Sequence, residues 1–170
     1  MHEEETVFIA LGSNLGDRSA YLAQGRRALA ELIRIEQVSA IYETPPWGPV
    51  EQPAYLNQVV RGTCNLPPEA LLASLKDIEQ HAGRTEGVRY GPRVLDLDIL
   101  FYGQWIMVTE KLVIPHARIA ERAFVLVPLV EIAPDWRHPV LNKSVTELLA
   151  ALGPQEEITR YDYDESAEMG

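Results

Sequence analysis

Residues 94–102 (VLDLDILFY) constrain the fold more than any other part of the chain, because apolar residues alternate there with two aspartates. Successive side chains of a β-strand point to opposite faces. Leu95, Leu97 and Ile99 are therefore predicted on one face of a strand, and Asp96 and Asp98 on the other. The α-carbons of the two aspartates would lie about 6.5–7 Å apart. The segment predicts a strand that is buried on one face and carries two neighbouring carboxylates on the other.

Two like charges at this separation on a half-buried strand repel unless a cation lies between them. Mg²⁺ is the natural candidate, since it binds one or two carboxylates and completes its shell with water and phosphate. The preceding loop carries Arg84, Arg89 and Arg93, and a guanidinium presents a planar fork of donors to phosphate oxygens. A lone D-x-D motif is more often part of an ordinary edge strand. With three arginines beside it, the pattern favours phosphoryl transfer, which depends on positioning and charge neutralisation.

The composition limits the classes of protein to consider. The chain has 170 residues, of which 46% are hydrophobic and 24% charged, and its net charge is −10. This length favours one domain over residues 1–170. The acidic balance argues against nucleic-acid or anionic-membrane binding, and no apolar run approaches the length of a membrane span. The single cysteine, Cys64, fits a reducing compartment, so we expect a cytoplasmic protein, and we expect it to be a monomer.

Hydrophobic periodicity and turn residues predict the order of the elements. Strands are expected at residues 6–11, 35–43, 55–64 and 94–102, and helices at residues 18–33 and 67–82, the first with Asp17 as its N-cap. The order β-α-β-β-α-β is that of a ferredoxin-like fold, an α+β sandwich with two helices on one face of an antiparallel sheet. Residues 105–108 are expected to pair back as a hairpin, and Glu79 and His81 to face solvent.

The last third of the chain is less regular. Pro128 is expected to interrupt any helix in the apolar stretch 119–130. Ser144 and Glu147 form a capping box that starts a further helix, and Gly153 ends it. Residues 155–170 are acidic and are expected to form a partly disordered tail.

A second candidate site lies in residues 44–53 (TPPWGPVEQP), where four prolines exclude regular structure. Prolines reduce the entropy that a binding loop loses on ordering, so this loop could present Trp47 to a ligand. A long hairpin connection with a packed tryptophan fits the composition equally well. On the following strand Asn57 shares a face with Tyr55, where its amide could read the edge of a ligand. No Walker A motif occurs, so an ATP site must be built without a P-loop.

Five blocks of the sequence together resemble one enzyme family. They are residues 10–16 (ALGSNLG), 44–48 (TPPWG), 52–57 (QPAYLN), 91–99 (GPRVLDLDI) and 114–116 (IPH). With these blocks in this order, over roughly residues 6–140, the chain resembles the 6-hydroxymethyl-7,8-dihydropterin pyrophosphokinases. The resemblance implies a ferredoxin-like fold and an enzyme of folate biosynthesis. Such an enzyme transfers the pyrophosphoryl group of ATP to the hydroxymethyl group of the pterin and releases AMP.

The resemblance also implies roles for individual residues. Asp96 and Asp98 would hold two Mg²⁺ ions, and with them Arg84 and Arg93 would act in catalysis by neutralising charge as the bond to the α-phosphate breaks. The co-substrate ATP would be bound by Lys76, Arg84, Arg89, Arg93, Ile99, Lys111, Leu112, His116 and Arg122, and Arg118 lies close to the last two in sequence. The pterin would be bound by Thr44, Pro45, Trp47, Tyr55, Asn57, Tyr90, Asp96 and Phe124, stacked between Tyr55 and Phe124.

Three positions depart from the usual family pattern, and two other functions remain open. Glu86 stands where another basic residue is common, Tyr90 replaces a common tryptophan, and Lys76 stands where many members carry a glutamine. A non-catalytic ferredoxin-like module that binds nucleotide or RNA is one alternative; the acidic charge and the lack of an aromatic RNA-binding strand argue against it. A metal-dependent nucleotide hydrolase is the other, and it would not need the stiff aromatic loop at 44–53.

Overall fold

The computed structural model describes residues 3–45, 54–82, 94–155 and 157–161. Its main sheet has the strand order β5-β1-β4-β3-β8, with β2 also paired to β4. The strands are β1 (Glu5–Ser13), β2 (Arg34–Val38), β3 (Tyr42–Thr44), β4 (Tyr55–Cys64), β5 (Asp96–Tyr102) and β8 (Thr159–Arg160). All pairings in this sheet are antiparallel. The expected ferredoxin-like, α+β architecture is confirmed.

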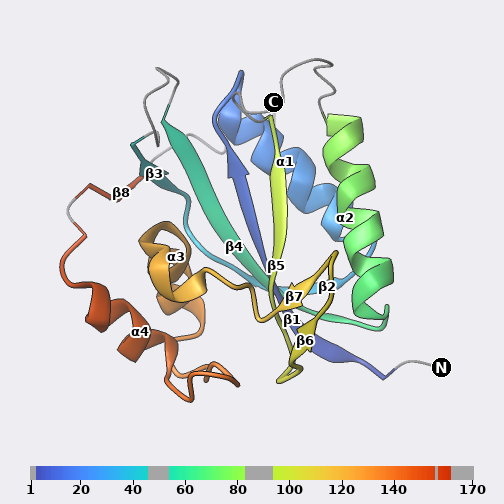
Figure 1. The fold of residues 1–170 in the computed structure, drawn as a ribbon. Coiled ribbons are helices and arrows are strands. Elements are labelled where there is room, and N and C mark those ends of the chain that lie inside the picture. Colours follow the sequence, from blue (N-terminus) through green and yellow to red (C-terminus); the bar gives the residue numbers. More distant parts are fainter. Residues whose placement is uncertain (1–2, 46–53, 83–93, 156, 162–170) are drawn as a thin grey trace.

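Helices cover both faces of the sheet (Figure 1). On one face lie α1 (Arg18–Leu29) and α2 (Pro68–Ala82), the helices of the β-α-β-β-α-β unit. On the other face lie α3 (Ala123–Ile132) and α4 (Val145–Leu152). The sequence correctly places the first pair on a common face, and the second pair adds a third layer. Each face of the sheet therefore has its own hydrophobic core.

Alternation along the strands assigns each side chain to one of these cores. Leu97 and Ile99 of β5 are buried in the core beneath α1 and α2, as their period predicts. Asp96 and Asp98 point to the opposite face, toward α3, and both stay partly exposed. The predicted division of this strand into an apolar and an acidic face is confirmed.

β5 carries a bulge at Leu100. The register sets Ile99 opposite Ile9 but Phe101 opposite Phe8, so Leu100 is an extra residue without a partner in β1. Leu100 and Phe101 consequently both lie in the core beneath α3 and α4. Because of the bulge, the first half of β5 presents Asp96 and Asp98 to the pocket, and its second half contributes two neighbouring residues to the core beneath α3 and α4.

The single strand predicted over residues 35–43 is wrong, because the structure breaks it into β2 and β3. The Oγ atom of Ser39 accepts a hydrogen bond from the Val59 backbone N–H over 3.0 Å, where a ladder would use a backbone carbonyl. The carbonyl of Ser39 instead accepts from the side-chain amide of Gln58 over 2.7 Å. The next residue, Ala40, donates its backbone N–H to the carboxylate of Glu131 in α3. Hydrogen bonds to the buried Ser39 and to the distant Glu131 thus interrupt the strand between Val38 and Tyr42.

Two further expectations about regular structure are wrong. Residues 105–108 do not pair with β5: β6 (Met107–Val108) pairs with β7 (Val113–Ile114) in a separate two-stranded sheet. Pro128 does not interrupt α3, although it lacks the N–H that would bond to the carbonyl of Phe124. The buried side chains of α3 on both sides of the proline hold the helix together against the core. A 3₁₀ turn, η1 (Ile119–Glu121), precedes it.

The helix caps follow the sequence closely. Asp17 caps α1 by accepting from the Ala20 N–H over 3.3 Å, although α1 ends four residues before the expected boundary. The capping box of α4 is complete, with both hydrogen bonds between Ser144 and Glu147 present. The C-terminal segment is ordered in part, since β8 pairs with β3.

Glu79 does not face solvent, contrary to expectation. Its side chain is 17% exposed, and its Oε2 atom accepts a hydrogen bond from the Leu97 backbone N–H over 2.7 Å. β5 is the edge strand next to α2, so an outward N–H on that edge needs a partner from outside the sheet. Glu79 provides it.

Candidate active site

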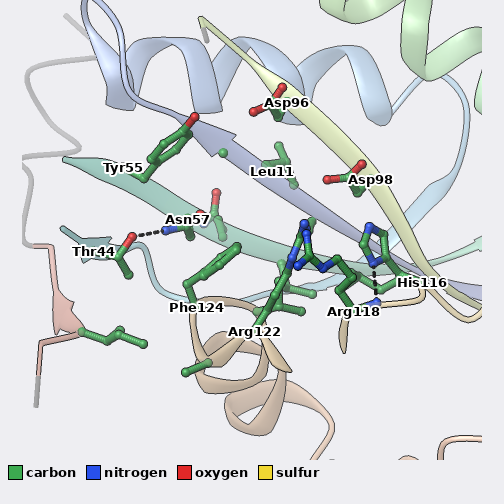
Figure 2. A pocket seen from close by; sticks show the side chains of 18 of the residues that line it. Leu11, Thr44, Tyr55, Asn57, Asp96, Asp98, His116, Arg118, Arg122 and Phe124 are labelled. Carbon is green, nitrogen blue, oxygen red and sulfur yellow. Dashed lines mark hydrogen bonds between the residues drawn. The ribbon is translucent and has the colours of Figure 1, made fainter. Parts of the chain in front are cut away.

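A cavity of about 590 Å³ lies between the sheet and the N-terminal end of α3. Its lining combines residues from β1, β3, β4 and β5 with residues from the segment that leads into α3 (Figure 2). The predicted site residues that line it are Thr44, Pro45, Tyr55, Asn57, Asp96, Asp98, His116, Arg122 and Phe124. Predicted residues that lie far apart in the sequence, from Thr44 to Phe124, therefore meet in one pocket.

The floor of the pocket is formed by two small residues of β1. Gly12 lies opposite Asn57 of β4 on one side and Asp96 of β5 on the other. Ala10 likewise lies opposite Asp98 of β5. A Cβ atom on Gly12 would lie 3.4 Å from the Oδ1 atom of Asn57, in van der Waals contact with the amide. The small side chains keep open the space between β4 and β5.

The β5 side of the pocket is acidic. Asp98 projects from β5 near His116, and Asp96 lies on the same strand farther from the segment before α3 (Figure 2). The hydrogen bond from Leu97 N–H to Glu79 lies on the backbone between them, and Glu79 also forms an ion pair with Lys76 over 3.3 Å. The backbone carrying the two aspartates is therefore held from the helix side as well as by β1.

The opposite side of the pocket is basic, with His116, Arg118 and Arg122 in its lining. The backbone N–H of Arg118 donates to Nδ1 of His116 over 3.2 Å. Nδ1 is thus an acceptor, and in the neutral ring Nε2 carries the proton as a donor. Burial lowers the pKa of His116, and the guanidinium groups of Arg122 and Arg118 lower it further, against the opposite effect of the Asp98 carboxylate.

The far end of the pocket combines a buried amide with aromatic rings. Asn57 donates from Nδ2 to Oγ1 of Thr44 over 3.0 Å, and the two residues are 8% and 7% exposed. Because Nδ2 makes this bond, Oδ1 can accept a hydrogen bond from a ligand. Tyr55 and Phe124 lie on either side of Asn57 (Figure 2), and the Arg122 guanidinium lies 5.6 Å from the centre of the Phe124 ring. This end suits a flat, polar ring.

Some of the predicted site residues lie elsewhere. Ile99 and Leu112 are buried in the core beneath α1 and α2, and Lys76 and Lys111 are exposed outside the pocket lining. Predictions for Trp47, Arg84, Glu86, Arg89, Tyr90 and Arg93 fall on residues outside those that the structure describes.

Sequence reasoning missed several residues of the lining. Gln155, Glu157 and Ile158 come from the C-terminal segment, which its acidic composition predicts to be partly disordered. Gln58 and Glu121 also contribute. The short alternation of residues 158–161 (ITRY) was the one available signal, and four residues are too few to separate a strand from a loop.

The two aspartates fit a hard cation that is shared with a ligand. Within the described ranges, no three His, Cys, Asp or Glu side chains gather to form a complete metal site. Mg²⁺ needs no such cluster, since it commonly binds through one or two carboxylates together with water and substrate phosphates. The pair at the edge of an open pocket, facing basic groups, matches that mode of binding.

Comparisons with known proteins identify the family. The family model of 7,8-dihydro-6-hydroxymethylpterin-pyrophosphokinase (HPPK) matches residues 8–134, more than half of the chain. The chain belongs to this family. A 2-amino-4-hydroxy-6-hydroxymethyldihydropteridine pyrophosphokinase of Methylorubrum extorquens is 45% identical over 150 residues, 87% of this chain and 94% of that protein. The relative of the same name from Aquifex aeolicus is 39% identical over 142 residues, 84% of this chain and 89% of that protein.

Longer proteins contain a similar part. A mitochondrial folate synthesis bifunctional protein of Arabidopsis thaliana is 48% identical over 130 residues, 76% of this chain but 24% of that protein. This chain thus spans about a quarter of that bifunctional protein. A crystal structure of Plasmodium falciparum HPPK-DHPS superposes with a TM-score of 0.77 at 16% identity, over 94% of this chain and 48% of that one. At this identity the likeness supports the fold alone.

Family membership confirms the resemblance seen in the sequence. As a member of this family, the chain is an ATP-dependent pyrophosphokinase of folate biosynthesis, and the alternative of a non-catalytic binding module is not favoured. ATP is its co-substrate. Among the helices in the described part of the chain, none is both long and apolar enough to cross a membrane.

Proposed function

We propose that the pocket between the sheet and α3 is where this enzyme transfers the pyrophosphoryl group of ATP to the hydroxymethyl group of 6-hydroxymethyl-7,8-dihydropterin, releasing AMP. One observation carries the proposal. The Asp98 carboxylate lies near His116 and Arg122, Asp96 lies on the same face of β5, and Asn57 lies on the other side of a floor of small residues. Acidic groups for a cation, basic groups for phosphates and an amide for a planar ring then meet in a single cavity.

The pterin is proposed to lie at the end formed by Asn57 and Thr44. The Oδ1 atom of Asn57, left available by the bond to Thr44, would accept from a donor on the pterin edge. Tyr55 and Phe124 supply aromatic faces for stacking, and Asp96 would lie on the side of the hydroxymethyl group. Pro45, in the same lining, together with Trp47 and Tyr90, would close the remaining sides.

Asp96 and Asp98 are proposed to hold two Mg²⁺ ions together with the triphosphate. The bound ions would reduce the negative charge of the phosphates and favour ionisation of the attacking hydroxyl. The backbone that carries the two aspartates is held by β1 on one edge and by Glu79 on the other. Preorganised carboxylates need no rearrangement when the cation arrives.

The basic side is proposed to bind the phosphates. Arg122 and the Nε2–H of His116 point into the pocket as donors, and a charged guanidinium forms strong bonds to phosphate oxygens. Arg84, Arg89 and Arg93 would add three more cations from the sequence before β5, with Arg84 and Arg93 acting on the breaking bond. Guanidinium groups neutralise charge without a proton transfer, which suits a step governed by electrostatics.

The adenosine is proposed to lie along the outer edge of β5. Leu97 N–H points away from β1 to Glu79, and alternate residues of a strand direct their N–H groups the same way. The backbone of Ile99 would therefore face outward and could bind the base, although its side chain is buried. Lys76, Lys111 and Leu112 would surround this position from α2 and from the turn before β7.

We further propose that the enzyme acts as a monomer in the cytoplasm and binds no nucleic acid. The single cysteine and the net charge of −10 support these proposals. The plant relative is named as a mitochondrial protein, so fractionation of cells is the direct test of location, and light scattering is the test of mass.

The reaction is tested by incubating the protein with ATP, Mg²⁺ and 6-hydroxymethyl-7,8-dihydropterin and identifying the nucleotide product. We expect pterin-dependent AMP, matched one for one by pterin diphosphate. ADP as the product would mean cleavage at the γ-phosphate and would overturn the proposal. Binding of both substrates without turnover would point to a non-catalytic module, and AMP formed equally without pterin would indicate a hydrolase.

A further inference from the structure

The C-terminal segment lies along one side of the pocket. β8 pairs antiparallel with β3, with Arg160 opposite Tyr42 and Thr159 opposite Glu43. Immediately beyond, the Tyr161 N–H donates to the carbonyl of Ile41 over 2.8 Å. The segment thus adds a strand to the sheet next to the strand that carries Thr44.

The register of this pairing decides which side chains reach the pocket. Continued by one residue, it sets Ile158 opposite Thr44, and residues opposite each other in a sheet share a face. That face is the α3 side, because the Tyr42 hydroxyl, two residues before Thr44, donates to Glu131 of α3 over 2.7 Å. Ile158 and Thr44 accordingly both line the cavity.

The other face of the segment is anchored to the opposite layer. Tyr161 packs against the core beneath α1 and α2, and the Arg18 guanidinium lies 5.6 Å from the centre of its ring. The same guanidinium bonds to the Glu43 carboxylate and to the Ala54 carbonyl, each over 2.8 Å. Arg18 therefore contacts the C-terminal segment, β3 and the residue that precedes β4.

We propose that Ile158 is a specificity-determining residue for the pterin, forming an apolar wall at the end of the pocket that holds Thr44 and Asn57. The inference rests on the proposed placement of the pterin at that end. Its ligand class is a flat heteroaromatic ring whose polar edge bonds to the buried amide and whose apolar surface contacts Ile158. The residues proposed to bind the phosphates lie on the part of the lining that β5 and the start of α3 supply. A change at Ile158 should therefore leave the binding of ATP unaffected.

The test compares steady-state kinetics of Ile158→Ala, Ile158→Val and Thr159→Ala with those of the wild type. Truncating a hydrophobic contact should raise KM for the pterin by about tenfold in Ile158→Ala, and by about two- to threefold in Ile158→Val. The kcat value and KM for ATP should stay within about twofold of wild type. Thr159→Ala is the matched control, because Thr159 is exposed and lies opposite Glu43, on the face turned away from the pocket.

Specificity gives a second measurement. The second substrate is a pterin that carries an additional methyl group on its ring. The wild type should have a higher kcat/KM for the unmethylated pterin than for the methylated one. This ratio should be smaller in Ile158→Ala, because the shorter side chain leaves more room for the methyl group. An unchanged KM for the pterin in Ile158→Ala, or an equal rise in KM for both substrates, would overturn the inference. Both outcomes presuppose a wild type that forms AMP with pterin; a wild type without that activity would instead contradict the proposed function.

Discussion

The side-chain amide of Asn57 donates a hydrogen bond from Nδ2 to the Oγ1 atom of Thr44, over 3.0 Å. Both residues are more than nine-tenths buried, and the structure turns the amide nitrogen toward Thr44. With Nδ2 engaged, Oδ1 is the atom presented to the pocket. The pair therefore gives the proposed pterin site an acceptor whose position is fixed before the ligand binds.

Thr44→Val tests this orientation. The substitution keeps the shape of the side chain and removes the acceptor, so the amide loses the bond that fixes it. A hydrogen bond of this kind contributes about 1 kcal/mol, and we expect KM for the pterin to rise by about five- to tenfold with KM for ATP unchanged. Thr44→Ser retains the hydroxyl and should stay near wild type. Equal kinetics of Thr44→Val and wild type would contradict the role of the pair.

Asp98→Asn and Asp96→Asn test the cation site. Each removes one negative charge at almost constant volume, so the fold should persist while kcat falls by at least about 10²–10³-fold. Turnover is measured with saturating ATP and Mg²⁺, and folding is checked by thermal unfolding. EDTA should stop the wild type, and excess Mg²⁺ should restore it. Normal turnover in either variant would exclude that aspartate as a metal ligand.

Glu79→Ala tests the support of the acidic strand. The change removes the partner of the Leu97 N–H, and leaving that group unpaired should lower the free energy of unfolding by about 1–2 kcal/mol. We also expect kcat to fall by about tenfold, because the backbone between the two aspartates loses its outer anchor. Glu79→Gln keeps an oxygen acceptor and is the control. If Glu79→Ala has wild-type kcat, the bond serves stability alone.

His138 predicts a pH dependence of stability. Burial lowers its pKa below the ordinary value, and its Nδ1 atom accepts from the backbone N–H groups of Val140 and Leu141. The unfolded chain therefore binds a proton at higher pH than the native state does. The stabilising contribution is complete above the unfolded pKa of about 6.5 and is lost as pH falls through that value toward the native pKa.

The measurement is urea unfolding at pH 7.5 and pH 5.5. The wild type should lose more stability between these two conditions than His138→Gln, which cannot be protonated. His81→Gln is the control, because His81 is exposed, and it should keep the full pH dependence of the wild type. An equal loss in His138→Gln and wild type would show that another group dominates.

Local signals in the sequence were sufficient for much of the fold. The bounds of β4 agree with prediction, as do the two caps at Asp17 and Ser144, because hydrophobic alternation and capping act within a few residues. The same is true of the acidic face of β5. The resemblance of motifs was enough to name the candidate residues on β3, β4, β5 and the start of α3. The structure places these residues in one cavity.

The features that sequence reasoning missed depend on partners far away in the chain. The break between β2 and β3 needs Gln58 and Glu131 to bond to the backbone around Ser39. The position of Glu79 depends on an edge N–H that exists only once the sheet has formed, and Pro128 is tolerated because the core holds α3. Ile158 reaches the pocket through pairing with β3. Periodicity within one segment carries no information on such contacts.

The floor of Gly12 and Ala10 has a consequence for how the two substrates are spaced. Asn57 and Asp96 lie on the two strands that flank β1, each opposite Gly12. Neighbouring strands lie about 4.8 Å apart, so the backbones of Asn57 and Asp96 lie roughly 10 Å apart. Changes elsewhere in the pocket can alter how tightly each substrate binds, but the spacing of the Asn57 and Asp96 backbones is set by the β-sheet.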